Sequence, residues 1–357
     1  MTEKPSILVI GAGPTGLTAA LELARLGIQP DVVERRSEPS ELSRAVGILP
    51  ETIDKLMPSG AGAAIRAEAM KIQKINIYRG DRPLMRLDFT NAKYREHVML
   101  GLPQNRTEEL LREALQRFGG DVQYGREATE ISTTDKVVSV QFADAKTRTY
   151  DWVIAADGLH SRMREALGIA YPGFDLDDEW SVADIDLEGY DNESVTGWIQ
   201  EPPGEFVFVI PIGRTRVRLA ASTSDAIAAL PVPLNITNIR RTGAFQIAIR
   251  QAETYKKGRV LLAGDAAHCH SPVGGRGMNL GIDDAIVAAT SILNGTTDTY
   301  TEARHKIGRR VLRGSERGRK LVCANGGFTK AITAMGMAAV HRTPFLRRMF
   351  LRVLTSL

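Results

Sequence analysis

Cysteine is scarce in this chain of 357 residues, which contains only Cys269 and Cys323. Two cysteines cannot form the disulfide framework of a small secreted domain. Long apolar runs are also missing, because no run approaches the roughly 20 residues that span a bilayer, and the N-terminus resembles a strand rather than a signal peptide. These absences predict a cytoplasmic protein without stable membrane insertion. The length of the chain is enough for two domains or one elaborated domain.

Acidic residues are nearly absent from the C-terminal segment. From Tyr300 onward there are 13 Lys and Arg against 2 Asp and Glu, so the rest of the chain holds 33 against 40. A basic tail can bind nucleic acid or anionic lipid, but charged helix faces are more often simply solvated. We therefore expect a helical segment that packs against the acidic body, without a nucleic-acid partner. One amphipathic stripe near its end consists of Phe345, Met349, Phe350, Val353 and Leu354.

The N-terminus contains the dinucleotide-binding fingerprint. Its parts, in order, are an apolar strand over 7–10, Gly-Ala-Gly-Pro-Thr-Gly over 11–16, a helix that ends at Gly27, a second strand over 31–33 and the acid Glu34. Gly11 permits a tight turn, Gly13 lets a pyrophosphate approach, and Gly16 allows close helix–strand packing. Glu34 is placed to hold ribose hydroxyls.

Two later strands also end in an acid beside a glycine. The apolar run 152–156 is followed by Asp157-Gly158, and the run 260–263 by Gly264-Asp265. Ligands of α/β folds bind at the carboxyl ends of parallel strands. The ends of these three strands are therefore predicted to line one edge of one sheet.

A loop with few side chains follows the last of these strands. Beyond Pro272 come Gly274-Gly275-Arg276-Gly277, and then a helix that Asn294-Gly295 ends. The N–H groups around Gly277, Met278 and Asn279 lie at the positive end of the helix dipole, so they favour an anion against them.

Long alternating stretches between 171 and 255 indicate a second, β-rich domain. A hairpin is expected to turn near Gly213, with Arg216 and Arg218 on one face of its second strand. These arginines either meet an acidic or phenolate substrate or are exposed strand charges. The predicted fold is α/β, in which a Rossmann-like domain (1–71, 98–170 and 257–299) contains an inserted β-rich substrate domain (72–97 and 171–256) and precedes a helical C-terminal segment (300–357).

The order and spacing of the three motifs resemble the single-component FAD-dependent aromatic hydroxylases, which have the para-hydroxybenzoate hydroxylase fold. The resemblance extends from Ile7 to about Tyr300 and implies FAD in the N-terminal fold. The positions that it and the fingerprint assign to the cofactor are Gly11, Gly13, Pro14, Thr15, Gly16, Glu34, Arg35, Arg44, Gln104, Asp157, Gly158, Asp265, Pro272, Gly277, Met278 and Asn279. Substrate contacts are expected at Phe208, Pro211 and Arg218.

The resemblance also implies a reaction. Such enzymes take electrons from NAD(P)H as a transient reductant, react the reduced flavin with O2 to a C4a-hydroperoxide, and hydroxylate a phenolic or polycyclic aromatic substrate. Two other interpretations remain: a flavin reductase or dehydrogenase of the same fold, or a non-catalytic flavin-binding protein with a docking tail. No catalytic side chain is assigned, and a homodimer is left open.

His268-Cys269-His270 is the one segment that suggests a metal. Adjacent residues of an extended chain point to opposite sides, whereas metal ligands are usually spaced, so no metal is expected. His268 is expected to pack behind the glycine loop.

Overall fold

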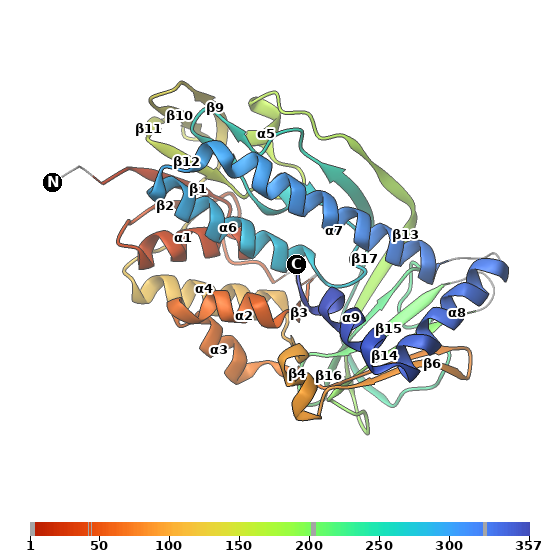
Figure 1. Ribbon diagram of the computed structural model, residues 1–357. Helices are drawn as coiled ribbons and strands as arrows, with labels where there is room; N and C mark the ends of the chain where they lie inside the picture. Colours follow the sequence, from red (N-terminus) through yellow and green to blue (C-terminus); the bar gives the residue numbers. More distant parts are fainter. Residues whose placement is uncertain (1–3, 42, 44, 201–204, 324–326) are drawn as a thin grey trace.

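Two β-sheets lie side by side in the computed structural model, which describes residues 4–41, 43, 45–200, 205–323 and 327–357. The six-stranded sheet and its helices contain the N-terminus, and the eight-stranded sheet lies beside them, as Figure 1 shows. The long helix α7 (Tyr300–Val322) runs across both. These layers match the predicted α/β class with an added β-rich part and a helical C-terminal segment.

The first sheet has six strands in the order β18-β19-β12-β1-β2-β8. Their bounds are β18 (Lys256–Lys257), β19 (Val260–Leu262), β12 (Trp152–Ala155), β1 (Ile7–Ile10), β2 (Asp31–Glu34) and β8 (Gln123–Tyr124). All neighbours from β19 to β8 run parallel, and β18 is antiparallel at the edge. Continuous apolar runs form the central strands β1, β12 and β19, whose residues are almost all buried, as is typical of a parallel sheet covered on both faces.

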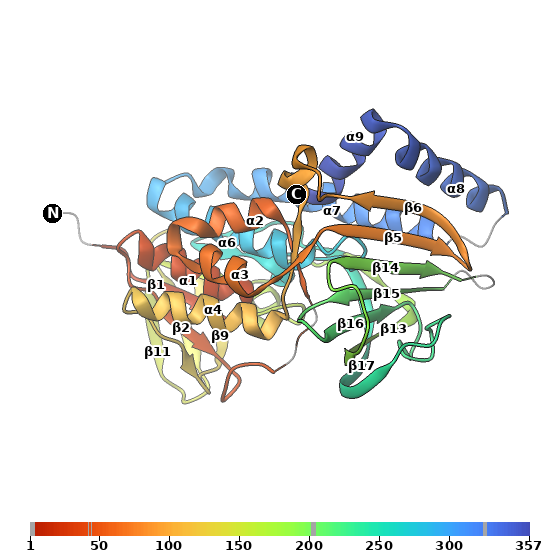
Figure 2. The same cartoon turned by 90° about the horizontal axis from the view of Figure 1, so that it is seen from below.

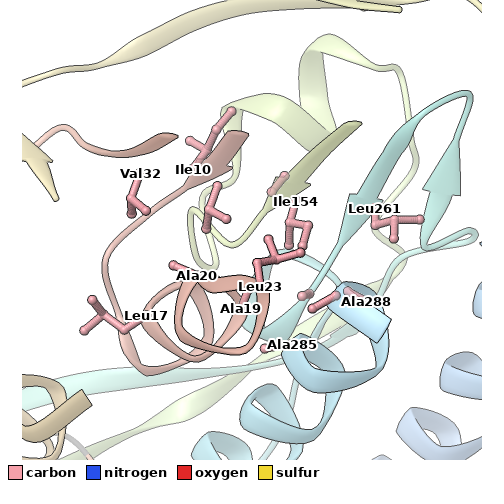
Figure 3. Packing of buried hydrophobic residues seen from close by; sticks show 14 of the residues in the cluster. Ile10, Leu17, Ala19, Ala20, Leu23, Val32, Ile154, Leu261, Ala285 and Ala288 are labelled. Atoms are coloured by element: carbon pink, nitrogen blue, oxygen red, sulfur yellow. The ribbon is translucent and has the colours of Figure 1, made fainter. Parts of the chain in front are cut away.

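Small side chains bring two helices close to this sheet. These helices are α1 (Pro14–Arg25) and α6 (Gly277–Asn294), which ends at the left-handed Gly295 as predicted. In Figure 3, Ala19 and Ala20 of α1 and Ala285 and Ala288 of α6 lie against Ile154 and its neighbours. Alanines leave room for branched side chains of the sheet, so these helices can pack closely on it.

The second sheet has eight strands in the order β20-β17-β13-β16-β15-β14-β5-β6. Their bounds are β20 (His268–Cys269), β17 (Ile236–Gln251), β13 (Gly173–Leu187), β16 (Arg216–Ala221), β15 (Phe206–Pro211), β14 (Ser194–Ile199), β5 (Lys74–Arg79) and β6 (Arg82–Asp88). Strands β15 and β16 form the predicted hairpin. Alternation along the strands gives each face its own apolar cluster, one containing Phe206 and the other Val207.

Two three-stranded sheets and several short helices complete the body. One of these sheets is an antiparallel meander of β9 (Ala128–Thr133), β10 (Val138–Phe142) and β11 (Thr147–Tyr150). The other sheet is β3 (Gly47–Ile48), β7 (Met99–Gly101) and β4 (Met70–Ile72). The helices are α2 (Pro50–Leu56), α3 (Ala61–Glu68), α4 (Gln104–Arg117) and α5 (Arg162–Ala166), with short 3₁₀ turns between elements.

The C-terminal segment is helical, as expected. Helices α8 (Gly327–Arg342) and α9 (Pro344–Thr355) lie over the β5–β6 side of the second sheet in Figure 2. Only part of the apolar stripe of α9 is buried, because Phe350 and Leu354 pack on the sheet while Phe345 is 73% exposed. No helix among the described residues is both long and apolar enough to span a membrane.

Candidate cofactor site

The three motifs follow adjacent parallel strands. Ile10 at the end of β1 is in register with Ala155 at the end of β12, and Ala155 with Leu262 at the end of β19. The predicted convergence of these strand ends is confirmed, and Figure 3 shows the three strands next to one another. A cleft built from loops at this edge is where such sheets bind ligands.

The glycines of the fingerprint loop have different reasons for lacking a side chain. Gly11 has φ +102°, and a Cβ there would lie 2.4 Å from the carbonyl oxygen of Ala156. A Cβ on Gly16 would lie 1.8 Å from the carbonyl oxygen of Gly11. Gly13 has an ordinary φ of −77° and no atom within 4 Å of its Cβ position. The protein itself therefore leaves Gly13 open, which fits a ligand lying against its backbone.

Helix α1 starts at this loop. Pro14 occupies its first turn, and no side chain among the described residues caps it, so its first N–H groups favour a phosphate. Thr15 packs under the third motif: Cβ atoms on Gly264 and Gly281 would lie 2.5 Å and 2.3 Å from its hydroxyl oxygen. The glycines thus couple the fingerprint loop to the Gly264-Asp265 turn.

Glu34 is buried at the end of β2 and bonds to the fingerprint loop. Its carboxylate accepts hydrogen bonds from the N–H of Ala12 at 2.8 Å and from Nε of Arg36 at 3.0 Å. Burial alone would raise the pKa of Glu34, but the bonds from Arg36 and Ala12 bring it below the ordinary value. The carboxylate is therefore ionised. Sequence reasoning chose Arg35, which is exposed, and missed Arg36, whose i+2 spacing from Glu34 was the available signal.

Gln104 connects helix α4 to the segment that contains Arg44, which itself lies outside the described residues. The side-chain oxygen of Gln104 accepts the N–H of Ala45 at 3.0 Å, and its Nε2 donates to Glu108 at 2.9 Å. Glu108 is buried, and this burial raises the pKa of its carboxyl to about 7. A protonatable acid thus lies beside the predicted adenosine end of the site.

Replacing Glu108 with glutamine is expected to stabilise the protein above neutral pH. The pKa of Glu108 is about 7 in the folded state and 4.5 ordinarily. The folded state therefore loses stability as pH rises from 4.5 to 7, because the unfolded chain releases this proton more readily, and the loss persists above pH 7. Glutamine cannot ionise, so Glu108→Gln should gain about 1–3 kcal/mol at pH 8 and nothing near pH 4. Thermal unfolding of both proteins across this pH range measures the difference.

The matched control is Glu109→Gln on the same helix, where the acid is exposed and pairs with Arg106. It should change stability by less than about 1 kcal/mol. An equal gain in both variants would contradict the assignment of the effect to burial of Glu108.

Asp157 caps a helix at the second strand end. Its carboxylate accepts the Ser161 hydroxyl at 2.6 Å and the Met163 N–H at 3.2 Å, which fixes the start of α5. Gly158 beside it has φ +86° and no atom within 4 Å of its Cβ position. This second stretch of accessible backbone faces outward at the same sheet edge.

Asp265 and Pro272 are exposed beyond the third strand. Asp265 lies in a single 3₁₀ turn (Gly264–Ala266), and its carbonyl oxygen accepts the Tyr171 hydroxyl at 2.9 Å. Asp265 is thus exposed beyond the carboxyl end of β19, where a polyhydroxylated chain could donate to its carboxylate.

The buried side chain of Asn279 holds the glycine loop in place. Its oxygen accepts the Leu49 N–H at 2.9 Å, and its Nδ2 donates to the carbonyls of Gly47 and Gly275 at 3.0 Å and 2.8 Å. No side chain among the described residues caps the start of α6 at Gly277. The first-turn N–H groups, including that of Met278, therefore keep the electrostatic character predicted for them. Sequence reasoning missed the side-chain clamp.

A buried ionic cluster supports the third motif from behind. Asp284 is fully buried and accepts the Gly264 N–H at 3.1 Å, His268 Nε2 at 2.5 Å and Arg304 Nε at 2.6 Å. Arg304 also donates to Asp283 at 2.7 Å. Burial would raise the pKa of Asp284, but His268 and Arg304 lower it. His268 packs behind the loop as expected, while its acid and arginine partners were missed.

Arg218 of the predicted substrate contacts is buried in the second sheet. It is 1% exposed and forms two 2.7 Å hydrogen bonds to Asp184 on the neighbouring strand β13. The interpretation of Arg218 as an exposed strand charge is therefore wrong, and its contact with substrate stays a prediction. Phe208 is half-buried on the same face as Arg218, whereas Pro211 is buried on the opposite face.

His268, Cys269 and His270 do not converge. Among the described residues no three His, Cys, Asp or Glu side chains are grouped to hold a metal ion. His270 instead bonds the Ser271 carbonyl through Nδ1 at 2.8 Å, and burial lowers its pKa to about 4.

Comparisons with known proteins place this site in a family. Residues 4–227 and 215–315 match the family model described as FAD binding domain. A 6-methylpretetramide 4-monooxygenase of Streptomyces rimosus is 28% identical over 99% of this chain and 69% of its own. A pentachlorophenol 4-monooxygenase of Sphingobium chlorophenolicum is 28% identical over 92% of this chain and 67% of its own. The crystal structure of a p-nitrophenol 4-monooxygenase from Pseudomonas putida has the same fold, with 22% identity, a TM-score of 0.86 and coverage of 98% and 97% of the two chains.

The chain belongs to the FAD binding domain family. It is an FAD-dependent monooxygenase of the aromatic hydroxylase type, so the predicted family, cofactor and enzyme class are confirmed.

Proposed function

We propose that this enzyme uses NAD(P)H and O2 to hydroxylate a phenolic or polycyclic aromatic substrate. The observation that carries the proposal is the convergence of three distant motifs on one sheet edge, with open backbone at Gly13 and Gly158. The names of two relatives, which act on 6-methylpretetramide and pentachlorophenol, support the substrate class.

FAD fits the residues present and would supply the electron transfer and oxygen activation when bound. The N–H groups at the start of α1 would hold its pyrophosphate, and ionised Glu34 would accept hydrogen bonds from its adenosine ribose. The N–H groups of Gly277, Met278 and Asn279 would stabilise negative charge on the ring system. The other parts of FAD would be bound by Asp157, Gly158, Asp265 and Gln104.

The substrate is expected between the glycine loop and the second sheet. The face of this sheet that contains Phe208 supplies apolar contact, and the Asp184–Arg218 pair adds a compensated polar group. Pro272 at the exposed start of the loop would orient the substrate ring and limit the access of water. Pro211 lies on the opposite face, so its contribution to a substrate contact would be through backbone position.

The test is oxidation of NAD(P)H by the purified holoenzyme in the presence of phenols and aromatic polyketides under labelled oxygen. An aromatic substrate should accelerate NAD(P)H consumption, and one labelled oxygen atom should enter the product. A same-fold reductase or dehydrogenase would consume NAD(P)H and leave every product unlabelled, and that result would contradict the proposal. A non-catalytic flavin-binding protein would show neither activity.

The remaining expectations concern partners and location. Neither Cys269 nor Cys323 forms a disulfide within the described residues, which is consistent with the cytoplasm proposed from the composition. The proposed partners are a small aromatic molecule and O2, with neither nucleic acid nor membrane insertion. A homodimer stays a prediction that the mass of the purified protein in solution would test.

A further inference from the structure

A basic groove lies between α7 and α9, behind the glycine loop. Its volume is about 930 Å³. The cations that line it are Arg276, Lys306, Arg309, Arg310, Arg313 and Arg317, against the two acids Glu253 and Glu302. This excess of positive charge within one cavity is not used by the proposed reaction.

The spacing of the α7 cations makes the groove electrostatically unfavourable by itself. Lys306 and Arg310, Arg309 and Arg313, and Arg313 and Arg317 are each four residues apart and share one face of the helix. Like charges at this spacing destabilise a helix. In the part of the chain that the structure describes, none of the groove cations lies within 4.0 Å of a carboxylate side chain, and Arg310 donates instead to a main-chain oxygen of Leu357 at 2.7 Å. Arg304 and Arg319 on the same helix do pair with carboxylate side chains.

Arg276 extends this positive charge from the glycine loop into the groove. Its guanidinium lies against α7, because a Cβ on Gly314 would be in van der Waals contact with it at 3.7 Å. One guanidinium nitrogen donates to the Val353 carbonyl, while the buried Nε has no hydrogen-bond partner among the described residues. Burial and the nearby Arg310 lower the pKa of Arg276. The unpaired Nε and the lowered pKa both indicate that no anion neutralises Arg276 within the described residues.

We propose that this groove binds a phosphate-bearing polyanion between α7 and α9, held by Arg309, Arg310 and Arg313 and by Arg276 of the glycine loop. Guanidinium groups match phosphate oxygens in pairs, and a cluster of them favours an anion of charge −2 or more over a single carboxylate. The site is separate from the sheet edge that binds FAD, but Arg276 is adjacent to Gly277, where α6 begins.

Titration calorimetry of the holoenzyme with inorganic pyrophosphate tests the site. Wild type should bind, and Arg309→Gln/Arg313→Gln should weaken binding by about tenfold or more because two charged hydrogen-bonding groups are lost. The control Arg82→Gln/Lys136→Gln removes the same charge from exposed positions on β6 and a distant turn, and should leave affinity within about twofold. All four positions are exposed, so folding should persist.

Sedimentation with phosphatidylglycerol vesicles, compared with phosphatidylcholine vesicles, separates the two sources of phosphate. Pyrophosphate binding that the groove variant loses supports a soluble ligand. Capture by phosphatidylglycerol alone, lost in the groove variant and kept in the control, supports a lipid headgroup as the phosphate source. Absence of both forms of binding, or equal loss in the two double variants, overturns the proposal. None of these readouts depends on turnover, so they remain informative if hydroxylation fails.

Discussion

Gly13→Val is expected to purify as a folded protein that contains almost no FAD. The structure leaves the Cβ position of Gly13 open, and its φ of −77° with ψ of −177° suits valine. No described protein atom therefore lies in contact with the first side-chain atom at this position. A pyrophosphate bound against the loop would clash with valine, because the branched side chain would occupy the space through which the phosphate approaches Gly13.

The measurement is the flavin absorbance per protein chain after purification and after soaking with excess FAD, together with far-ultraviolet circular dichroism. Gly336→Val is the matched control, since Gly336 is exposed on α8 with no atom within 4 Å of its Cβ position. It should retain stoichiometric flavin. Stoichiometric FAD in Gly13→Val would show that the cofactor lies elsewhere.

Gly16→Val should behave differently, although it changes the same motif. Its Cβ would lie 1.8 Å from the Gly11 carbonyl oxygen, so the helix could not pack on its strand. Loss of soluble folded protein is expected here, whereas Gly13→Val should lose only the ligand. The contrast separates the structural and the binding roles of two glycines three residues apart.

Arg304→Met is expected to lower the stability of the folded protein strongly. The substitution leaves Asp284, which is fully buried, with only His268 and the Gly264 N–H as partners among the described residues, and removes one of the partners of Asp283. Removal of one member of a buried ion pair typically costs about 3–5 kcal/mol, because a charge stays buried without compensation. For a protein of this size, the thermal midpoint should fall by about 5–10 °C.

Lys320→Met on the same helix is the control, because Lys320 is exposed and its pair with Glu316 spans 3.6 Å. Its effect should stay below about 1 kcal/mol. A midpoint of Arg304→Met within the error of wild type would contradict the importance of the cluster. Flavin content should fall along with stability, since Asp284 also binds the Gly264 N–H at the third strand end.

Local sequence signals predicted the elements that hold the cofactor. The strand, glycine turn and helix at the N-terminus follow from a short motif with matching periodicity, and the later strands end in an acid beside a glycine. Their adjacency could be inferred because parallel strands of one α/β sheet share an edge. The signal for the β15–β16 hairpin was equally local, because alternating apolar residues and a turn near Gly213 were enough to predict it.

The interactions that no local pattern encodes were missed. Arg218 meets Asp184 because β13 and β16 pair in one register, and a shift of one residue would place the two side chains on opposite faces of the sheet. Asp284 and Arg304 meet because α6 and α7 pack at one level. The burial of Glu108 likewise depends on which helix face meets the body. Hydrophobic spacing on α9 indicated an apolar stripe, but not that Phe350 would be covered and Phe345 exposed.

The adjacency of β1, β12 and β19 also bears on how the molecule is made. Residues near Ile10, Ala155 and Leu262 become neighbours only after most of the polypeptide has left the ribosome. Contacts over such sequence separation form late because closing long loops costs entropy. FAD can be captured only by a nearly finished chain, and its capture then stabilises the folded form by mass action. The amount of folded enzyme that accumulates in the cell should accordingly depend on the supply of flavin during synthesis.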